Sequence, residues 1–421
     1  GLNDGDRPVL SALLQAEEPL RLSGLHQAVE GRVPYKTRQQ LSRRLNALAH
    51  SGLVRKYPKG PQTTYSPDPE AVARAYLAID PGYRTLKPYD RQRIEGYRPN
   101  RDRWLPREVA EEARRLSEAV METGETVNRL VFRRLMVDIA WASSSLEGNT
   151  YTLGETRALI EAGDPASGRS AAETRMVKNH AEAAEYLIHN ARTLTVSEGV
   201  LRGLHKLLAR DLVASAGEEG AVRDGPVQVE RTAYLPDPNP HVLQSGLQTI
   251  AEKAAAIDDP YEQAFFLLLA LPYLQPFSDV NKRTGRLAAN IPLLYRGLVP
   301  LSYLGVPRAD YIRGLVAFYE LGTPSLMARV FLEGYRAAAD RYRSYFHVLE
   351  TDQRPGGEYR EEVRALVRGF VEAVARGEER PEDPERFFRA HLSMADAAVR
   401  EAVILAARRA VRDLDEAEAV G

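Results

Sequence analysis

One short segment of the chain gathers the side chains best suited to chemistry. A hydrophobic stretch ends there in a proline-containing loop, and the next expected helix, 282–296, opens with cations. The start of a helix offers free backbone N–H groups and the positive end of its dipole, so cations placed there favour an anionic ligand over plain solvation. A carboxylate beside them suits a divalent cation bridging to phosphates. The residues concerned are Asp279, Asn281, Lys282, Arg283 and Arg286.

The same segment resembles a known motif. Residues 275–286 read Gln-Pro-Phe-Ser-Asp-Val-Asn-Lys-Arg-Thr-Gly-Arg, which is similar to the signature of the Fic (Fido) family, His-Pro-Phe-x-Asp/Glu-Gly-Asn-Gly/Lys-Arg-x-x-Arg. Residues 143–149, Ser-Ser-Ser-Leu-Glu-Gly-Asn, resemble the inhibitory motif of that family. Residues 220–236 resemble its flap hairpin, against which the target protein is aligned. The resemblance covers residues 105–340, and three elements in the right order make it specific.

This resemblance implies a function and a set of site residues. The implied activity is transfer of AMP from ATP, with Mg²⁺, to a Ser, Thr or Tyr hydroxyl of a protein bound at the flap. Asp279 would bind Mg²⁺, and Arg286 would hold the γ-phosphate until Glu147 pairs with it in the resting protein. A carboxylate and a guanidinium can form such a charge-assisted pair. The inhibitory motif also includes Ser143 and Gly148. The remaining nucleotide-binding positions are Asn281, Lys282, Arg283 and Gly285.

Two departures from the signature bear on catalysis. Gln275 stands where the family has its catalytic His, and an amide cannot take the proton of the attacking hydroxyl near pH 7, so a rate factor of about 10²–10⁴ is expected to be missing. Val280 replaces a Gly and adds a Cβ to the anion loop. Positioning and charge neutralisation still support phosphoryl-type transfer. We therefore expect weak or altered AMP transfer, with a non-catalytic nucleotide sensor that regulates transcription as the alternative. A third hypothesis gives the chain only protein partners.

No other residue stands out as a base or a metal ligand. The chain has no cysteine, so thiolate chemistry and disulfides are excluded. His180, His205 and His241 are isolated from one another, and none belongs to a spacing typical of metal sites. A single His within a helix is expected to be packed or hydrogen-bonded for structure.

Helices must position these residues. The fold class expected is mainly α, with a Fic-type helical core and a small β-hairpin flap. Residues 341–421 should form a helical extension, with a closing helix near 391–415, that packs on the body or mediates a homodimer. The amphipathic periodicity predicts helices over 107–122, 126–146, 153–162, 170–192, 196–213, 241–256, 259–274, 282–296, 307–320 and 324–340.

Residues 1–70 differ from the rest in charge. Residues 1–66 carry ten Arg and Lys against five Asp and Glu. Helices are expected over 8–16, 22–30 and 38–50, the last with a capping box at Thr37 and Gln40 and a left-handed stop at Gly52, followed by a hairpin. This pattern resembles a winged helix-turn-helix, which implies DNA binding, with a protein-protein or dimerisation module as the alternative. The candidate DNA contacts are Gln39, Gln40, Arg43, Arg44, Arg55, Lys56 and Lys59.

Length and composition set the frame for these segments. The 421 residues suggest about three domains. Residues 71–104 lack a sustained period and are expected to form a connector, with one short helix at 69–78. The first residues are polar and unlike a signal peptide, and the longest apolar stretch falls short of a membrane span. A cytoplasmic protein without membrane contact is the expectation.

Overall fold

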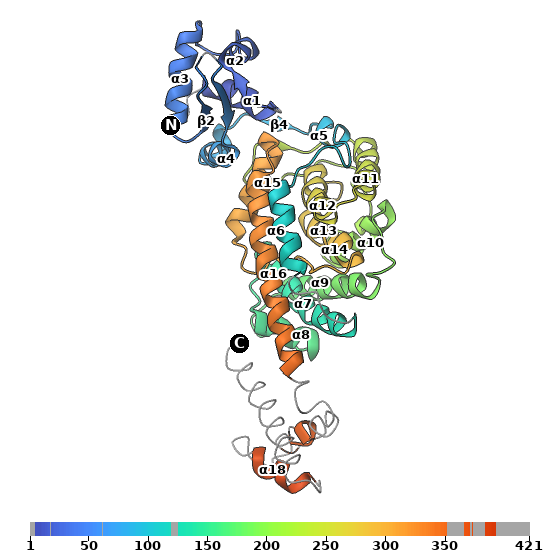
Figure 1. Cartoon of the computed structure of the whole chain (residues 1–421). Coiled ribbons are helices and arrows are strands. Elements are labelled where there is room, and N and C mark those ends of the chain that lie inside the picture. The colour runs from blue at the N-terminus through green and yellow to red at the C-terminus, as the bar shows by residue number, and fades with distance from the viewer. Residues whose placement is uncertain are drawn as a thin grey trace.

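The computed structural model describes residues 5–16, 18–60, 62–118, 125–351, 366–370, 373 and 384–392. Figure 1 shows a small N-terminal head at one end, a helical body in the middle, and α18 (Pro384–His391) at the far end. The mainly helical fold class is confirmed. Among the described helices, none combines the length and the apolar character needed to cross a bilayer. The closing helix predicted near 391–415 falls almost entirely outside the described residues.

The head packs three helices against an antiparallel sheet of three strands. The predicted capping box begins the third helix: the Gln40 N–H donates to Thr37 Oγ1 at 3.2 Å, and Gly52 adopts φ +77° just after its end. Leu41, Leu45 and Leu48 face the core of the head. The elements are α1 (Asp6–Gln15), α2 (Leu22–Ala28) and α3 (Arg38–His50), with strands β1 (Leu20–Arg21), β2 (Val54–Tyr57) and β3 (Thr64–Pro67) in the order β1-β3-β2.

The segment expected to be a connector is packed into the body. It contains α4 (Pro69–Leu77), η1 (Pro81–Tyr83), β4 (Lys87–Pro88) and α5 (Gln92–Glu95). The side chains of Ile94 and Tyr97 are buried in the main hydrophobic core, and the Tyr97 hydroxyl donates to Glu262 at 3.0 Å. Residues 71–104 therefore stabilise the body rather than only joining it to the head.

The body surrounds α12 (Pro260–Leu274), whose residues from Ala264 onward are all buried. The helix predicted over 282–296 is divided at Ala289, since Pro292 cannot donate a backbone bond and its ring crowds the carbonyl four residues earlier. The other helices are α6 (Arg107–Glu118), α7 (Glu125–Leu146), α8 (Leu153–Glu161), α9 (Ala171–His189), α10 (Glu198–Ala209), η2 (Ala216–Glu218), α11 (Pro240–Ala255), α13 (Asn281–Ala288), α14 (Asn290–Tyr295), α15 (Arg308–Leu321) and α16 (Ser325–Thr351).

The hairpin expected at 220–236 is not formed. The only strand in this segment, β5 (Tyr234–Leu235), pairs in parallel with β4, through bonds from Lys87 N to Ala233 O at 2.8 Å and from Tyr89 N to Leu235 O at 2.9 Å. The guanidinium of Arg223 bonds the carbonyls of Gly225 and Asp237, which ties the ends of the segment together without a second strand. The flap segment is therefore an extended loop held by the body.

A buried carboxylate joins several parts of the molecule. Glu320, on α15, accepts hydrogen bonds from the Tyr76 hydroxyl on α4 at 2.8 Å and from the Arg84 guanidinium at 2.9 Å. It also accepts from the Thr232 hydroxyl at 2.7 Å and from the Ala233 N–H at 2.9 Å. This carboxylate therefore connects α4, the residues after it and the flap segment to the body.

Candidate functional site

The loop between α12 and α13 turns sharply at two residues with left-handed backbones. Gln275 closes α12 at φ 53°, and Val280 precedes α13 at φ 64°. A β-branched residue is strongly disfavoured at positive φ because its Cβ crowds the backbone. Val280 is nevertheless buried at 2% exposure, and its N–H donates to Asp279 Oδ1 at 2.6 Å. The loop thus keeps a glycine-like conformation without a glycine.

The two amide side chains of the loop bond to each other. Asn281 donates to Gln275 Oε1 at 2.8 Å and to Phe277 O at 2.9 Å, and it accepts from Phe277 N at 3.0 Å. Gln275 in turn donates to Pro272 O at 2.8 Å. Asn281 was expected to hold phosphates, but its amide is buried and used within the loop, so in this conformation it shapes the site instead.

Arg286 lies at the centre of the site and is 1% exposed. Its Nε donates to Ser143 Oγ and its Nη2 to Ser143 O, both at 2.9 Å. The guanidinium also lies over the Tyr311 ring, 5.0 Å from the centroid. Its ion pair with Glu147 joins Nη2 to Oε1 at 2.7 Å. The residues of the inhibitory-like motif and the last Arg of the loop motif are thus in direct contact.

Glu147 is held by two cations. Beyond Arg286, its Oε2 lies 2.8 Å from Lys282 Nζ. Burial opposes ionisation of this carboxyl, but Arg286 and Lys282 outweigh it and bring its pKa down to about 2. Glu147 is therefore an anion placed at the start of α13, where the sequence predicts an anionic ligand.

Two buried guanidinium groups keep unused donors. Nη1 of Arg283 and Nη1 of Arg286 have no hydrogen-bond partner within the described structure. Burial lowers the pKa of Arg283, whose Nη2 reaches Asp279 only at 3.4 Å. Unpaired buried donors are costly, and phosphate oxygens would satisfy them. The donor set therefore fits a phosphate-bearing ligand.

Asp279 is the residue expected from the sequence to bind a metal ion. Its side chain is 69% exposed at the mouth of the loop. Mg²⁺ is commonly bound by one or two carboxylates together with substrate phosphates and water. No group of three metal-ligating side chains occurs among the described residues. A single exposed carboxylate beside the cations of α13 has the chemistry of an Mg²⁺ ligand that works together with an anionic ligand.

His205 braces this loop, which confirms the expectation that it is packed and hydrogen-bonded for structure, although the sequence did not indicate the loop as its partner. The Gly220 N–H donates to its Nδ1 at 2.9 Å, so the ring proton lies on Nε2, which donates to Asp279 O at 3.2 Å. The ring stacks on Phe277. Burial lowers the pKa of His205 to about 4, with Arg283 adding to the effect. A neutral His with both nitrogens engaged is a structural support and is not available as the missing base.

A second brace comes from the flap segment. The Arg223 N–H donates to Pro276 O at 3.0 Å, and its Nε donates to Gln275 O at 2.8 Å. This cation lies in the stretch that resembles the flap, but only the tertiary structure shows that it fixes the backbone of Gln275. Gln275 is therefore held through both its backbone and its side chain.

The two glycines named as site residues have local roles. A Cβ on Gly285 would lie 2.9 Å from Pro272 Cδ, so this glycine lets α13 approach α12 closely. Gly148 has φ +96° and reverses the chain just after Glu147.

His180 also contacts the inhibitory-like motif. It is buried, with Nδ1 donating to Met176 O, and its Nε2 lies 2.9 Å from Ser143 Oγ.

The candidate DNA contacts divide into two groups. Arg44 forms an ion pair with the buried Asp6, so it stabilises the head. Three others bond within the head: Arg55 to Asp68, Lys56 to Asn46, and the Gln40 side chain in the capping box. The remaining candidates are exposed, and their side chains make no hydrogen bond or ion pair within the described structure; they are Gln39, Arg43 and Lys59.

Comparisons with known proteins agree with this geometry. Residues 195–293 match the family model described as Fic/DOC family. The chain is 28% identical over 196 residues to a protein adenylyltransferase fic-1 of Caenorhabditis elegans, covering 45% of this chain and 38% of that protein. It is 30% identical over 177 residues to a protein adenylyltransferase Fic of Nematostella vectensis, covering 40% of each.

The chain thus spans about two fifths of the length of these curated relatives. A solved structure of Fic-1 (aa134–508) from C. elegans matches with a TM-score of 0.50 and 19% identity, over 82% of this chain and all of that chain. At this identity the likeness shows the fold.

Proposed function

We propose that this chain, which carries a Fic/DOC family domain at residues 195–293, binds ATP with Mg²⁺ and slowly transfers AMP to a protein hydroxyl. Its relatives are protein adenylyltransferases. The observation that carries the proposal is the position of Glu147, an anion held between Arg286 and Lys282. In this proposal Glu147 occupies the site of the terminal phosphate and keeps the resting protein closed.

The donors around the site support phosphate binding. Displacing Glu147 would free Lys282 and Arg286, and the unused Nη1 donors of Arg283 and Arg286 lie among them. Asp279 would hold Mg²⁺ beside the phosphates, and the ion would neutralise charge on the reacting groups. The residues present therefore supply binding and electrostatic stabilisation.

The transfer step has no side-chain base in this site. The target hydroxyl oxygen would form a bond to the α-phosphorus, and the bond from that phosphorus to the pyrophosphate oxygen would break. With Gln275 at the position of the usual His, the hydroxyl proton would leave to water. Positioning and charge neutralisation remain as sources of rate. We therefore expect slow transfer.

One observation favours a second candidate function. The amide of Gln275 is bonded at both ends inside the loop, to Asn281 and to Pro272 O, so it is not directed at a substrate. In this alternative the core binds a nucleotide without transferring it, and the head reports the bound state to DNA. Gln39, Arg43 and Lys59 would be the DNA contacts, and the segment 220–236 would meet a protein target in the transferase.

The test replaces Glu147 by Gly and measures ATP binding by calorimetry with Mg²⁺. Loss of a buried charge-assisted pair worth about 1.5–3 kcal/mol should raise ATP affinity by about 10- to 100-fold. Glu161→Gly removes an exposed carboxylate from the end of α8 and serves as the matched control. Equal affinities in the parent and in Glu147→Gly, or no ATP binding by either, would overturn the proposal.

A further inference from the structure

Glu147 lies in a short turn that follows α7. The helix ends at Leu146, Gly148 reverses the chain, and α8 begins at Leu153. We call residues 147–150 the clamp turn. Beyond Glu147 itself, the side chains of Asn149 and Thr150 and the Thr150 N–H are bonded to residues outside the nucleotide site. The position of Glu147 is therefore set by contacts on the far side of the turn.

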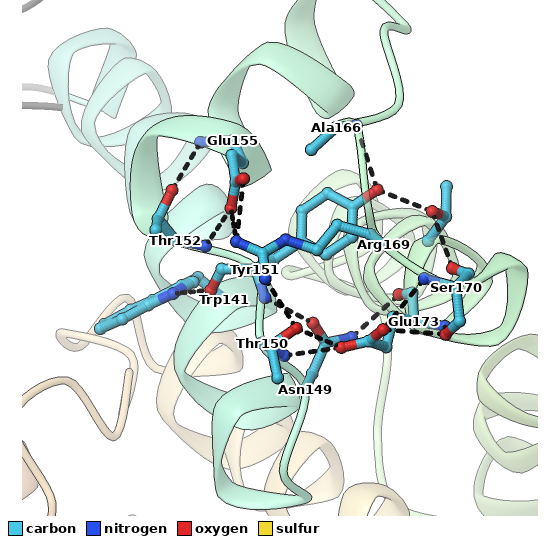
Figure 2. Close-up of polar contacts among 11 residues, drawn as sticks. Trp141, Asn149, Thr150, Tyr151, Thr152, Glu155, Ala166, Arg169, Ser170 and Glu173 are labelled. Carbon is cyan, nitrogen blue, oxygen red and sulfur yellow. Dashed lines mark hydrogen bonds and ion pairs between the residues drawn. The ribbon is translucent and has the colours of Figure 1, made fainter.

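Glu173, in the first turn of α9, accepts three hydrogen bonds from the clamp turn (Figure 2). Its Oε1 accepts from the Thr150 N–H at 2.9 Å and from the Thr150 hydroxyl at 2.6 Å. Its backbone O accepts from Asn149 Nδ2 at 2.9 Å. The same carboxylate closes the capping box of α9 at Ser170. One side chain thus serves both the start of α9 and the clamp turn.

Arg169 completes the connection. Its Nη1 donates to Thr150 Oγ1 at 2.9 Å, and its Nη2 donates to Glu155 Oε2 at 2.7 Å. Glu155 closes the capping box of α8 at Thr152. Figure 2 shows the Thr150 hydroxyl between Arg169 and Glu173, so it links the starts of both helices.

Electrostatics strengthens these bonds. The Thr150 hydroxyl and N–H and the capping contacts at Ser170 lower the pKa of Glu173 to about 2, so the carboxylate is ionised throughout the neutral range. Hydrogen bonds to an ionised acceptor are stronger than neutral ones. On the other side of the turn, Arg308 Nε donates to Leu146 O at 2.9 Å. Glu147 is therefore fixed from both sides.

We propose that Thr150, Glu173 and Arg169 form a latch that positions Glu147 on Arg286, and that ATP opens the latch when it displaces Glu147. This inference rests on the proposed function and names a further level of its regulation. A ligand that binds only the open form has an apparent affinity reduced by the fraction of open molecules. Weakening the latch should raise that fraction, although no latch residue contacts the nucleotide.

The experiment replaces Thr150 by Val in the full chain, which removes the hydroxyl and keeps the backbone N–H. Loss of about 1 kcal/mol of hydrogen bonding should raise ATP affinity about fivefold, measured by calorimetry with Mg²⁺. The same change in a Glu147→Gly background should have no effect, because no clamp remains to release. A general loss of stability would lower affinity in both backgrounds. Thr249→Val, on α11, removes a hydroxyl bonded to Ser245 O and is the control.

Two outcomes separate the latch from the proposed function. If Glu147→Gly binds ATP more tightly and Thr150→Val does not, the Glu147 side chain moves off Arg286 without any change in the clamp turn, and the latch proposal is wrong. If no variant binds ATP, the proposed function fails, and hydrogen exchange then tests the latch without nucleotide. The amides of residues 147–150 should exchange at least severalfold faster in Thr150→Val than in the parent. Equal exchange rates would overturn the inference.

Discussion

Replacing Gln275 by His tests two roles of this position: the missing general base in AMP transfer, and the hydrogen bonds that hold the loop. A neutral imidazole can accept the proton that an amide cannot, so the change should restore a general base. We expect AMP transfer to rise by about 10²–10⁴-fold when Glu147→Gly is present in both chains to open the site. The assay follows label from α-labelled ATP on protein, with Mg²⁺, at pH 7.5.

The same replacement should lower stability, and the structure gives the size of the effect. Gln275 uses Oε1 for Asn281 and Nε2 for Pro272 O, and Asn281 is only 4% exposed. A His that turns one nitrogen toward the substrate gives up at least one of these bonds. Leaving a buried polar group unpaired costs about 1–3 kcal/mol. Urea unfolding of the two Glu147→Gly chains should show a loss in this range.

The two readouts must move in opposite directions. Label in both chains at equal rates would refute the idea that the missing base limits transfer. Label only in the His-containing chain would favour the nucleotide sensor for the natural sequence. Unchanged stability together with faster transfer would show that the two side-chain bonds of Gln275 contribute little to folding, which contradicts the structural role assigned to it.

Two further predictions concern the head and the pH dependence. Arg44→Met should destabilise the head by about 1.5–3 kcal/mol in urea unfolding, because the buried Asp6 would lose its ion pair with Arg44, whereas Arg43→Met should leave stability unchanged and weaken salt-dependent binding to duplex DNA. Equal effects of the two changes on stability would contradict the assignment. The pKa of His205 is lowered to about 4, so its neutral form stabilises the fold above pH 6.5, and this contribution fades as the pH falls toward 4. Between pH 7.5 and 5 the free energy of unfolding of the parent should fall by about 2 kcal/mol more than that of His205→Gln. Identical pH profiles of unfolding for the two proteins would contradict this role of His205.

Local sequence signals predicted the local structure well. Thr37 and Gln40 form their capping box because both partners lie within one helical turn. The sequence predicted one helix over 282–296 and not the division at Ala289, because the amphipathic period continues across Pro292. The flap segment was expected to be a hairpin, but its strand β5 pairs in parallel with β4, which lies about 150 residues earlier in the sequence.

The site shows the same limit at longer range. The resemblance of the two motifs to the Fic pattern already implied that Glu147 pairs with Arg286. Nothing in the sequence indicated that Lys282 would share the same carboxylate or that His205 would hold Asp279 O. Such contacts depend on tertiary packing, and each residue alone is typical of an ordinary helix surface or interior.

The hydrogen bonds of the Glu320 carboxylate determine which truncated fragments of the chain keep the body stable. It is a buried charge whose cost is offset by donors from separate stretches, Tyr76 among them. A fragment that starts after α4 would lack that donor, and its weak folding would be mistaken for a property of the core. A fragment that starts at Asp68 keeps the helix cap and Tyr76 together. Fragments for binding studies are therefore best divided just before α4.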